Sequence, residues 1–123
     1  RINDVVRTLG QYGINMHAFS MAESADFGIL RLIVSDVDKA VEVLRERDFA
    51  VMSTDVVCLS CANVPGALAT VLEYLAAEQI FIEYMYAFAQ NDRAHVVIKP
   101  NDMQRCIKVL QEHHCDVLTR DRL

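Results

Sequence analysis

The chain repeats itself, and this repeat constrains the fold more than any other feature. When the sequence is displaced by 66 positions, residues 1–57 align with residues 67–123 without a gap, and ten aligned pairs are identical. The apolar pattern coincides along nearly the whole alignment, with helix periods and helix-start signals in register. A chance match would not keep these signals together. We therefore expect two copies of one folding unit, over residues 1–54 and 55–123.

Each copy contains an amphipathic helix followed by two strands. The helix, from Ile2 in one copy and Leu68 in the other, carries apolar residues at i, i+3, i+4 and i+7, the spacing of one buried face. Alternating apolar residues at 14–18 and 80–88 predict a half-buried strand. A turn at 24–26 or 90–92 separates it from a more continuously apolar strand at 29–34 or 95–99, as expected for strands interior to a sheet.

A second helix and a short last strand complete each copy. Ser35 and Asn101 have the character of cap residues, and each is followed three positions later by an acid or amide, Asp38 or Gln104. The final strands are expected near residues 49–53 and 115–119.

The second copy has one element without a counterpart, an apolar strand at residues 56–60. In a βαββαβ sheet this opening strand is central, and its omission leaves backbone groups of its neighbours unpaired. We therefore expect about ten residues, a strand and a turn, to precede Arg1 in the functional protein. Pairing of the first copy's third and fourth strands with nothing between them would refute this.

Residues 63–66, with the sequence Asn-Val-Pro-Gly, stand where that extra strand meets a helix. Asn63 is suited to cap the helix, Pro65 to its first turn, and Gly66 to a close approach of another group to the backbone. A helix N-terminus offers free N–H groups and the positive end of the helix dipole, which favour an anion such as a carboxylate. The alternative is that the tetrapeptide only starts the helix.

The strand, the Asn-x-Pro-Gly turn, the Leu- and Val-striped helix and the next strand, which opens on Ile, together resemble the ACT domain family. The runs Asp-Phe-Gly-Ile-Leu-Arg at residues 26–31 and Ile-Glu-Tyr-Met-Tyr at residues 82–86 are similar to small stand-alone tandem-ACT proteins of bacteria and archaea. The resemblance implies an α+β fold of two ferredoxin-like βαββαβ units. Their antiparallel sheets are backed by helices on one face, and the first unit lacks its opening strand.

The resemblance also implies where a ligand binds. ACT units pair side by side and hold amino acids where the first loop of one unit faces the second strand of its neighbour. Glu83 or Asn15 is then placed to receive an α-amino group. Carried onto this chain, the ligand-binding residues are Asn63, Pro65, Gly66, Ala67 and Leu68 of the loop, Ile80, Phe81, Ile82, Glu83 and Tyr84 of the second copy, and Ile14, Asn15, Met16 and His17 of the first copy.

Two cysteines raise the alternative of metal binding. Cys58 and Cys61 have C-x-x-C spacing, but they lie within a predicted strand, where positions i and i+3 point to opposite faces. A closed structural zinc site also needs four ligands. We expect buried free thiols, no metal and no cofactor.

The remaining polar and aromatic motifs also favour structural roles. His17 and His95 lie on predicted strands without a nucleophile at a recognisable catalytic spacing, so we expect no enzymatic activity. An aromatic row from Tyr84 to Phe88 is open to interpretation as a base-stacking platform. The net charge of −5 opposes that interpretation, because nucleic-acid affinity depends on clustered Lys and Arg.

These observations together favour a non-catalytic regulatory protein of the ACT type that binds a small molecule, with an amino acid as the expected ligand. No apolar run approaches the roughly 18 residues of a membrane span, so we expect a cytoplasmic protein without a membrane partner. The net charge leads us to expect no nucleic-acid partner either. Expected partners are a second copy of the chain, in a homodimer, and a metabolic enzyme. The alternative is a ligand-free oligomerisation module that associates with such an enzyme.

Overall fold

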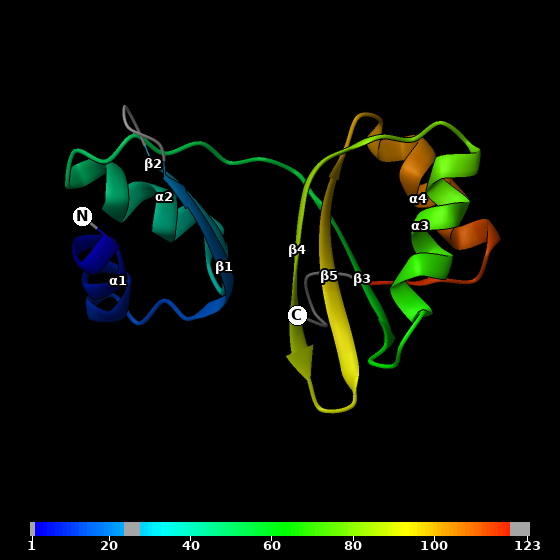
Figure 1. Cartoon of the computed structure of the whole chain (residues 1–123). Coiled ribbons are helices and arrows are strands. Elements are labelled where there is room, and N and C mark those ends of the chain that lie inside the picture. Colours follow the sequence, from blue (N-terminus) through cyan, green and yellow to red (C-terminus); the bar gives the residue numbers. More distant parts are fainter. Residues whose placement is uncertain (1, 24–27, 119–123) are drawn as a thin grey trace. The chain divides into compact units, whose positions relative to one another are not determined.

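A computed structural model describes residues 2–23 and 28–118 (Figure 1). The chain divides into two compact units, which we call unit 1 (Arg1–Thr54) and unit 2 (Asp55–Leu123). The turn expected at residues 24–26 and the end of the last strand lie outside the described residues. In the described part of the chain, no helix is long and apolar enough to cross a membrane.

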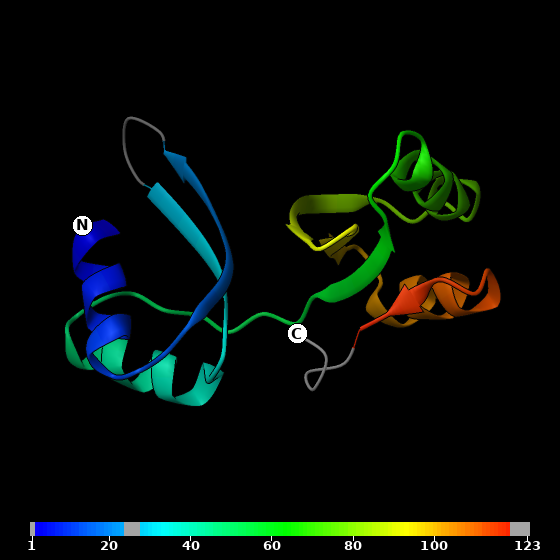
Figure 2. The same cartoon turned by 90° about the horizontal axis from the view of Figure 1, so that it is seen from below.

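Unit 2 is a complete ferredoxin-like βαββαβ unit. Its elements are β3 (Val57–Ala62), α3 (Ala67–Ala77), β4 (Ile82–Gln90), β5 (Arg93–Pro100), α4 (Met103–Glu112) and β6 (Asp116–Val117). The sheet order is β4-β5-β3-β6, and every neighbouring pair is antiparallel. Both helices lie on one face of this sheet (Figures 1 and 2). The predicted α+β fold class is therefore confirmed.

The core of unit 2 lies between the helices and the sheet face that they cover. Alternate residues of β3 and β5 point to the helices, as the period of two in a strand requires. Leu59, at the centre of the sheet, is fully buried. The buried residues of this core are Val57, Leu59, Val71, Leu75, Ile80, Val96, Ile98, Cys106, Val109 and Leu110.

Unit 1 contains α1 (Ile2–Gln11), β1 (Met16–Glu23), β2 (Gly28–Val34) and α2 (Val37–Glu46), with β1 and β2 forming a two-stranded antiparallel sheet. The expectation of a strand at residues 49–53 is wrong, since these residues form no strand. In unit 2 the corresponding strand β6 pairs with β3, and the described part of unit 1 has no counterpart of β3. Phe49 and Val51 nevertheless pack against the core of Leu9, Ile14, Ala40, Val43 and Leu44.

Unit 1 also exposes apolar side chains on β1. Phe19 and Met21 on β1 are 60% and 54% exposed, whereas Met85, the counterpart of Phe19, packs against the unit 2 core.

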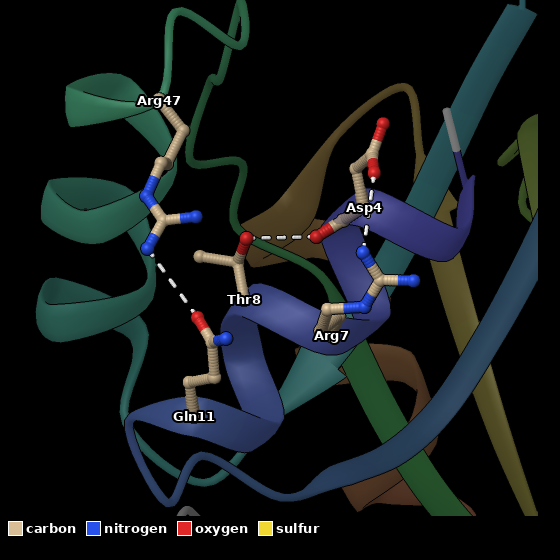
Figure 3. Close-up of polar contacts among 5 residues, drawn as sticks. All are labelled: Asp4, Arg7, Thr8, Gln11 and Arg47. Atoms are coloured by element: carbon tan, nitrogen blue, oxygen red, sulfur yellow. Dashed lines mark hydrogen bonds and ion pairs between the residues drawn. The ribbon is translucent and has the colours of Figure 1, made fainter.

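The two helices of unit 1 contact each other through a hydrogen bond from Arg47 Nη2 to Gln11 Oε1 at 3.3 Å (Figure 3). Within α1, Thr8 Oγ1 donates to the carbonyl of Asp4.

The repeat extends to the hydrogen bonds that end the helices. In α3 the N–H of Gln79 donates to the carbonyl of Ala76 and the N–H of Ile80 to that of Leu75, both at 3.0 Å. This pair of bonds is a Schellman motif, which needs a left-handed residue, and Gln79 has φ 58°. The same pair of bonds ends the other three helices, with Gly13, Asp48 and His114 as the left-handed residues.

The caps of α2 and α4 lie one residue later than the sequence suggests. The carboxylates of Asp36 and Asp102 accept from the N–H groups of Lys39 and Arg105, each at 3.1 Å. Asn101 Oδ1 instead accepts from the N–H of Phe81 at 2.8 Å. Ser35 makes the same type of bond to Asn15, so these side chains hold the starts of the hairpin strands instead of capping the helices.

Replacing Gln79 with glycine is expected to stabilise unit 2. A left-handed non-glycine residue costs roughly 1–2 kcal/mol, and glycine loses about 0.5–1 kcal/mol in extra chain entropy. The free energy of unfolding, measured in urea, should therefore rise by about 0.5–1 kcal/mol. The control is Ala76→Gly, inside α3, which should lower it by about 1 kcal/mol. A loss of stability in Gln79→Gly would contradict the assigned helix end.

Candidate ligand site at the start of helix α3

A tight turn joins β3 to α3. The N–H of Ala67 donates to the carbonyl of Val64 at 3.3 Å, and Gly66 has φ 85° and ψ −14°. These angles match the third position of a type II β-turn, where φ is positive, and Pro65 occupies the second position, where its ring fixes the required φ. A Cβ on Gly66 would meet no atom within 4 Å. Gly66 is therefore required by the backbone angle, and the space above it is open.

The turn corrects two expectations about how the helix begins. Pro65 lies before the helix and not in its first turn, because the left-handed Gly66 separates the two. The N-cap residue is Gly66, which makes no side-chain cap, so the prediction that Asn63 caps the helix is wrong. Asn63 instead extends the sheet, donating its N–H to the carbonyl of Asp92 at 3.1 Å.

Two backbone donors of α3 are left open by this arrangement. The first intrahelical bond runs from the N–H of Thr70 to the carbonyl of Gly66 at 3.1 Å. The N–H groups of Leu68 and Ala69 precede it, and within the described residues they have no acceptor. The first turn also carries no acidic side chain. An exposed helix start with open donors suits a carboxylate, through hydrogen bonds and the helix dipole.

The predicted strand residues of unit 2 lie at the start of β4, which is an edge strand. Ile80 is buried in the core, and Ile82 packs against that core. Neither side chain is therefore exposed to a ligand. Phe81 is 69% exposed. Glu83 is also exposed, and it forms an ion pair with Lys99 at 3.7 Å. Tyr84 is half-buried.

The predicted residues of unit 1 have the same arrangement. Ile14 is buried in the core and Met16 packs against it. Asn15 is exposed, and its N–H donates to Ser35 Oγ at 2.9 Å. His17 is half-buried on β1.

Within unit 2 the loop and the strand residues lie at opposite ends of the sheet. Ala62, at the end of β3, pairs with Arg93, and Arg93 pairs with Gln90 at the far end of β4. Ile82, at the start of β4, pairs with Pro100. The structure thus brings the loop residues together and the strand residues together, but it does not join the two sets within this unit.

Residues that support these sets were missed by sequence reasoning. Asp92 holds the loop through its carbonyl, and Asn101 holds the backbone of Phe81 from both sides, accepting its N–H and donating to its carbonyl at 2.9 Å. The role of Asp92 has no sequence signal, because a backbone carbonyl is involved. The role of Asn101 was detectable in principle, since Ser35 and Asn15 stand at the same spacing in the first copy.

A family model and one solved structure agree with this architecture. The family model described as "ACT domain pair" matches residues 1–123. The crystal structure of protein BT0572 from Bacteroides thetaiotaomicron is 54% identical, with a TM-score of 0.95, and the match covers 99% of this chain and 85% of that one. A candidate glycine cleavage system transcriptional repressor is 16% identical, with a TM-score of 0.38, over 95% of this chain and 86% of that one. No protein with a curated description matches the chain.

The two cysteines of β3 lie on opposite faces of the sheet. Cys61 packs against the core under the helices, whereas Cys58 is buried on the other face, and all four cysteines are free thiols. Burial raises the pKa of Cys58 to about 11. Burial, with a smaller contribution from Asp102, also raises the pKa of Cys106. In the described residues, no three His, Cys, Asp or Glu side chains converge as ligands for a metal ion.

The raised pKa of Cys58 predicts a loss of stability at alkaline pH. Below pH 9.0, the ordinary pKa, the thiol is neutral in both the folded and unfolded states. As the pH rises from there through about 11, the Cys58 thiol ionises in the unfolded chain before it ionises in the folded chain. This ionisation favours the unfolded state, so the free energy of unfolding falls across this range. The free energy of unfolding, measured in urea across this pH range, should fall more steeply in the wild type than in Cys58→Ala. Parallel losses in the two proteins would count against the assigned burial.

Proposed function

The chain belongs to the family of ACT domain pairs, and from this premise we propose that it is a non-catalytic regulatory protein that binds an amino acid. A pair of ACT domains has a regulatory, ligand-binding role, and no catalytic machinery is evident in the described residues. The amino acid is the more specific part of the proposal. It requires a group that recognises a carboxylate and a second group that recognises the rest of the ligand.

The observation that carries the proposal is the type II turn at the start of α3. It leaves the N–H groups of Leu68 and Ala69 open, and the left-handed Gly66 has no side chain above it. A ligand carboxylate approaching from solvent therefore meets two backbone donors at the positive end of a helix dipole. No charged side chain of the first turn competes for these donors.

We propose that a second unit completes the site. The loop and the start of β4 lie at opposite ends of the unit 2 sheet, so a ligand in contact with both must lie between two units. β4 is an edge strand, and its open edge suits pairing with another unit. This favours a homodimer in which the loop faces residues 80–84 or 14–17 of a neighbouring unit, where Glu83 or Asn15 receives the α-amino group.

Regulation in this proposal follows from the position of the ligand between units. A ligand that contacts two units binds one packing of them better than another, and it therefore shifts the population toward that packing. A metabolic enzyme in the cytoplasm that prefers one packing would then sense the amino acid. A ligand-free oligomerisation module is the second candidate, and the exposure of Phe19 and Met21 on unit 1 favours it.

A thermal-shift screen of the twenty amino acids separates the two candidates. A ligand present at 100 times its Kd stabilises the folded state by about 2.7 kcal/mol, so at least one amino acid should raise the melting temperature in a concentration-dependent way. If none does, the ligand-free module is the better account.

A pair of glycine variants then tests the loop. Gly66→Val should abolish the shift, because its side chain fills the space above the open donors. The matched control is Gly13→Val: Gly13 also has a positive φ, 68°, and a Cβ there also meets no atom within 4 Å. Backbone strain is therefore comparable in the two variants, and only Gly66→Val should lose the response to the amino acid. Equal loss in both would show that strain, and not the site, is responsible.

A further inference from the structure

The sheet of unit 2 has a second face, which points away from α3 and α4. Strand register places Ser60 opposite His95 on β5 and opposite Asp116 on β6, all on this face. These three residues and Arg93 line a hollow of about 270 Å³, together with Gln90 and Asn91 of the β4–β5 turn. Leu118 completes the lining, which is otherwise polar. None of these residues belongs to the loop at the start of α3.

The guanidinium of Arg93 is held in place within this hollow. Its Nε donates to Ser60 Oγ and its Nη2 donates to the carbonyl of Ser60, both at 3.0 Å. These two bonds use one edge of the planar fork and fix its direction. The donors that remain on the group are pre-oriented, which reduces the entropy lost when an anion binds.

His95 supplies the second observation that points to a ligand. Its side chain lines the hollow and is only 7% exposed, yet its Nδ1 is buried without a hydrogen-bond partner among the described residues. The ring also makes an edge contact with Phe88, with centroids 5.1 Å apart. An unpaired buried nitrogen costs free energy, and a polar group bound in the hollow would remove that cost.

We propose that this hollow is a second ligand site, which takes a small carboxylate such as that of an amino acid. The ligand carboxylate lies toward Arg93 and His95. A fixed guanidinium suits a carboxylate because its donors match the two oxygens. The volume fits a small metabolite and is below the range of pockets for drug-sized ligands.

The site is specific to unit 2. In the repeat alignment the positions of Arg93, His95 and Asp116 are occupied by Phe27, Ile29 and Ala50 in the first copy. The described part of unit 1 has no strand that corresponds to β3, and therefore no counterpart of Ser60. Among the aligned positions, only the second copy carries this set of polar and charged side chains.

Side-chain NMR of the full chain tests the proposal. The twenty L-amino acids, added in pools, should include at least one that shifts both the ring nitrogens of His95 and the Nε–H of Arg93, with saturation. The Nε–H of Arg47, whose guanidinium is bonded to Gln11 in unit 1 and belongs to neither proposed site, is the internal control and should not move. The amide derivative of the active amino acid should bind at least about tenfold more weakly, because it has lost the carboxylate that Arg93 recognises.

Two variants locate the binding. Arg93→Gln should weaken the response of His95 at least about tenfold. His95→Gln should do the same to the response of Arg93, and it provides the test if Arg93→Gln fails to fold. Gly66→Val should leave both responses unchanged, so failure of the loop site and failure of this site give different results. The proposal is overturned if no pool moves His95 and Arg93, or if either variant retains the wild-type affinity.

Discussion

Strand β3 is the element on which unit 2 depends. It pairs with β5 on one side and β6 on the other, and Leu59 at its centre is fully buried. One face of β3 supplies the core under α3 and α4, and the other supplies Ser60, which fixes Arg93. Its end leads directly into the turn at Gly66. In unit 1, where the described residues contain no such strand, the last strand does not form and Phe19 and Met21 remain exposed.

The turn after β3 is the part of the fold on which the proposed ligand binding depends, and it acts through its backbone. β3 ends at Ala62 and α3 starts at Ala67, and the left-handed Gly66 between them turns the chain so that the first donors of α3 are open to solvent. In the proposed function these donors recognise a carboxylate and not a particular side chain, because they belong to the backbone. Selectivity among amino acids must then come from the second unit. This division of roles connects ligand binding to the packing of units, which is the requirement for regulation.

The repeat, the order of elements and the apolar faces were predictable, since they follow from local periodicity that is present twice. The errors arose where the outcome depends on tertiary partners. Ser35 and Asp36 both carry an oxygen suited to capping, and only the strand start beside Ser35 decides between them. Residues 49–53 have strand character but no strand to pair with. Gly66 was expected to allow a close approach, which stays a prediction, and the structure adds that its φ requires glycine. The unpaired nitrogen of His95 depends on packing and leaves no trace in the sequence.

Amide NMR tests the central claim most directly, namely that the start of α3 binds the carboxylate of an amino acid. The backbone N–H signals of Leu68 and Ala69 are followed while each amino acid is added to the full chain. For at least one of them, both signals should move downfield and saturate together, whereas Gln104 should not move, because Asp102 already caps the start of α4. If Leu68 and Ala69 move no more than Gln104 with all twenty amino acids, the claim is contradicted.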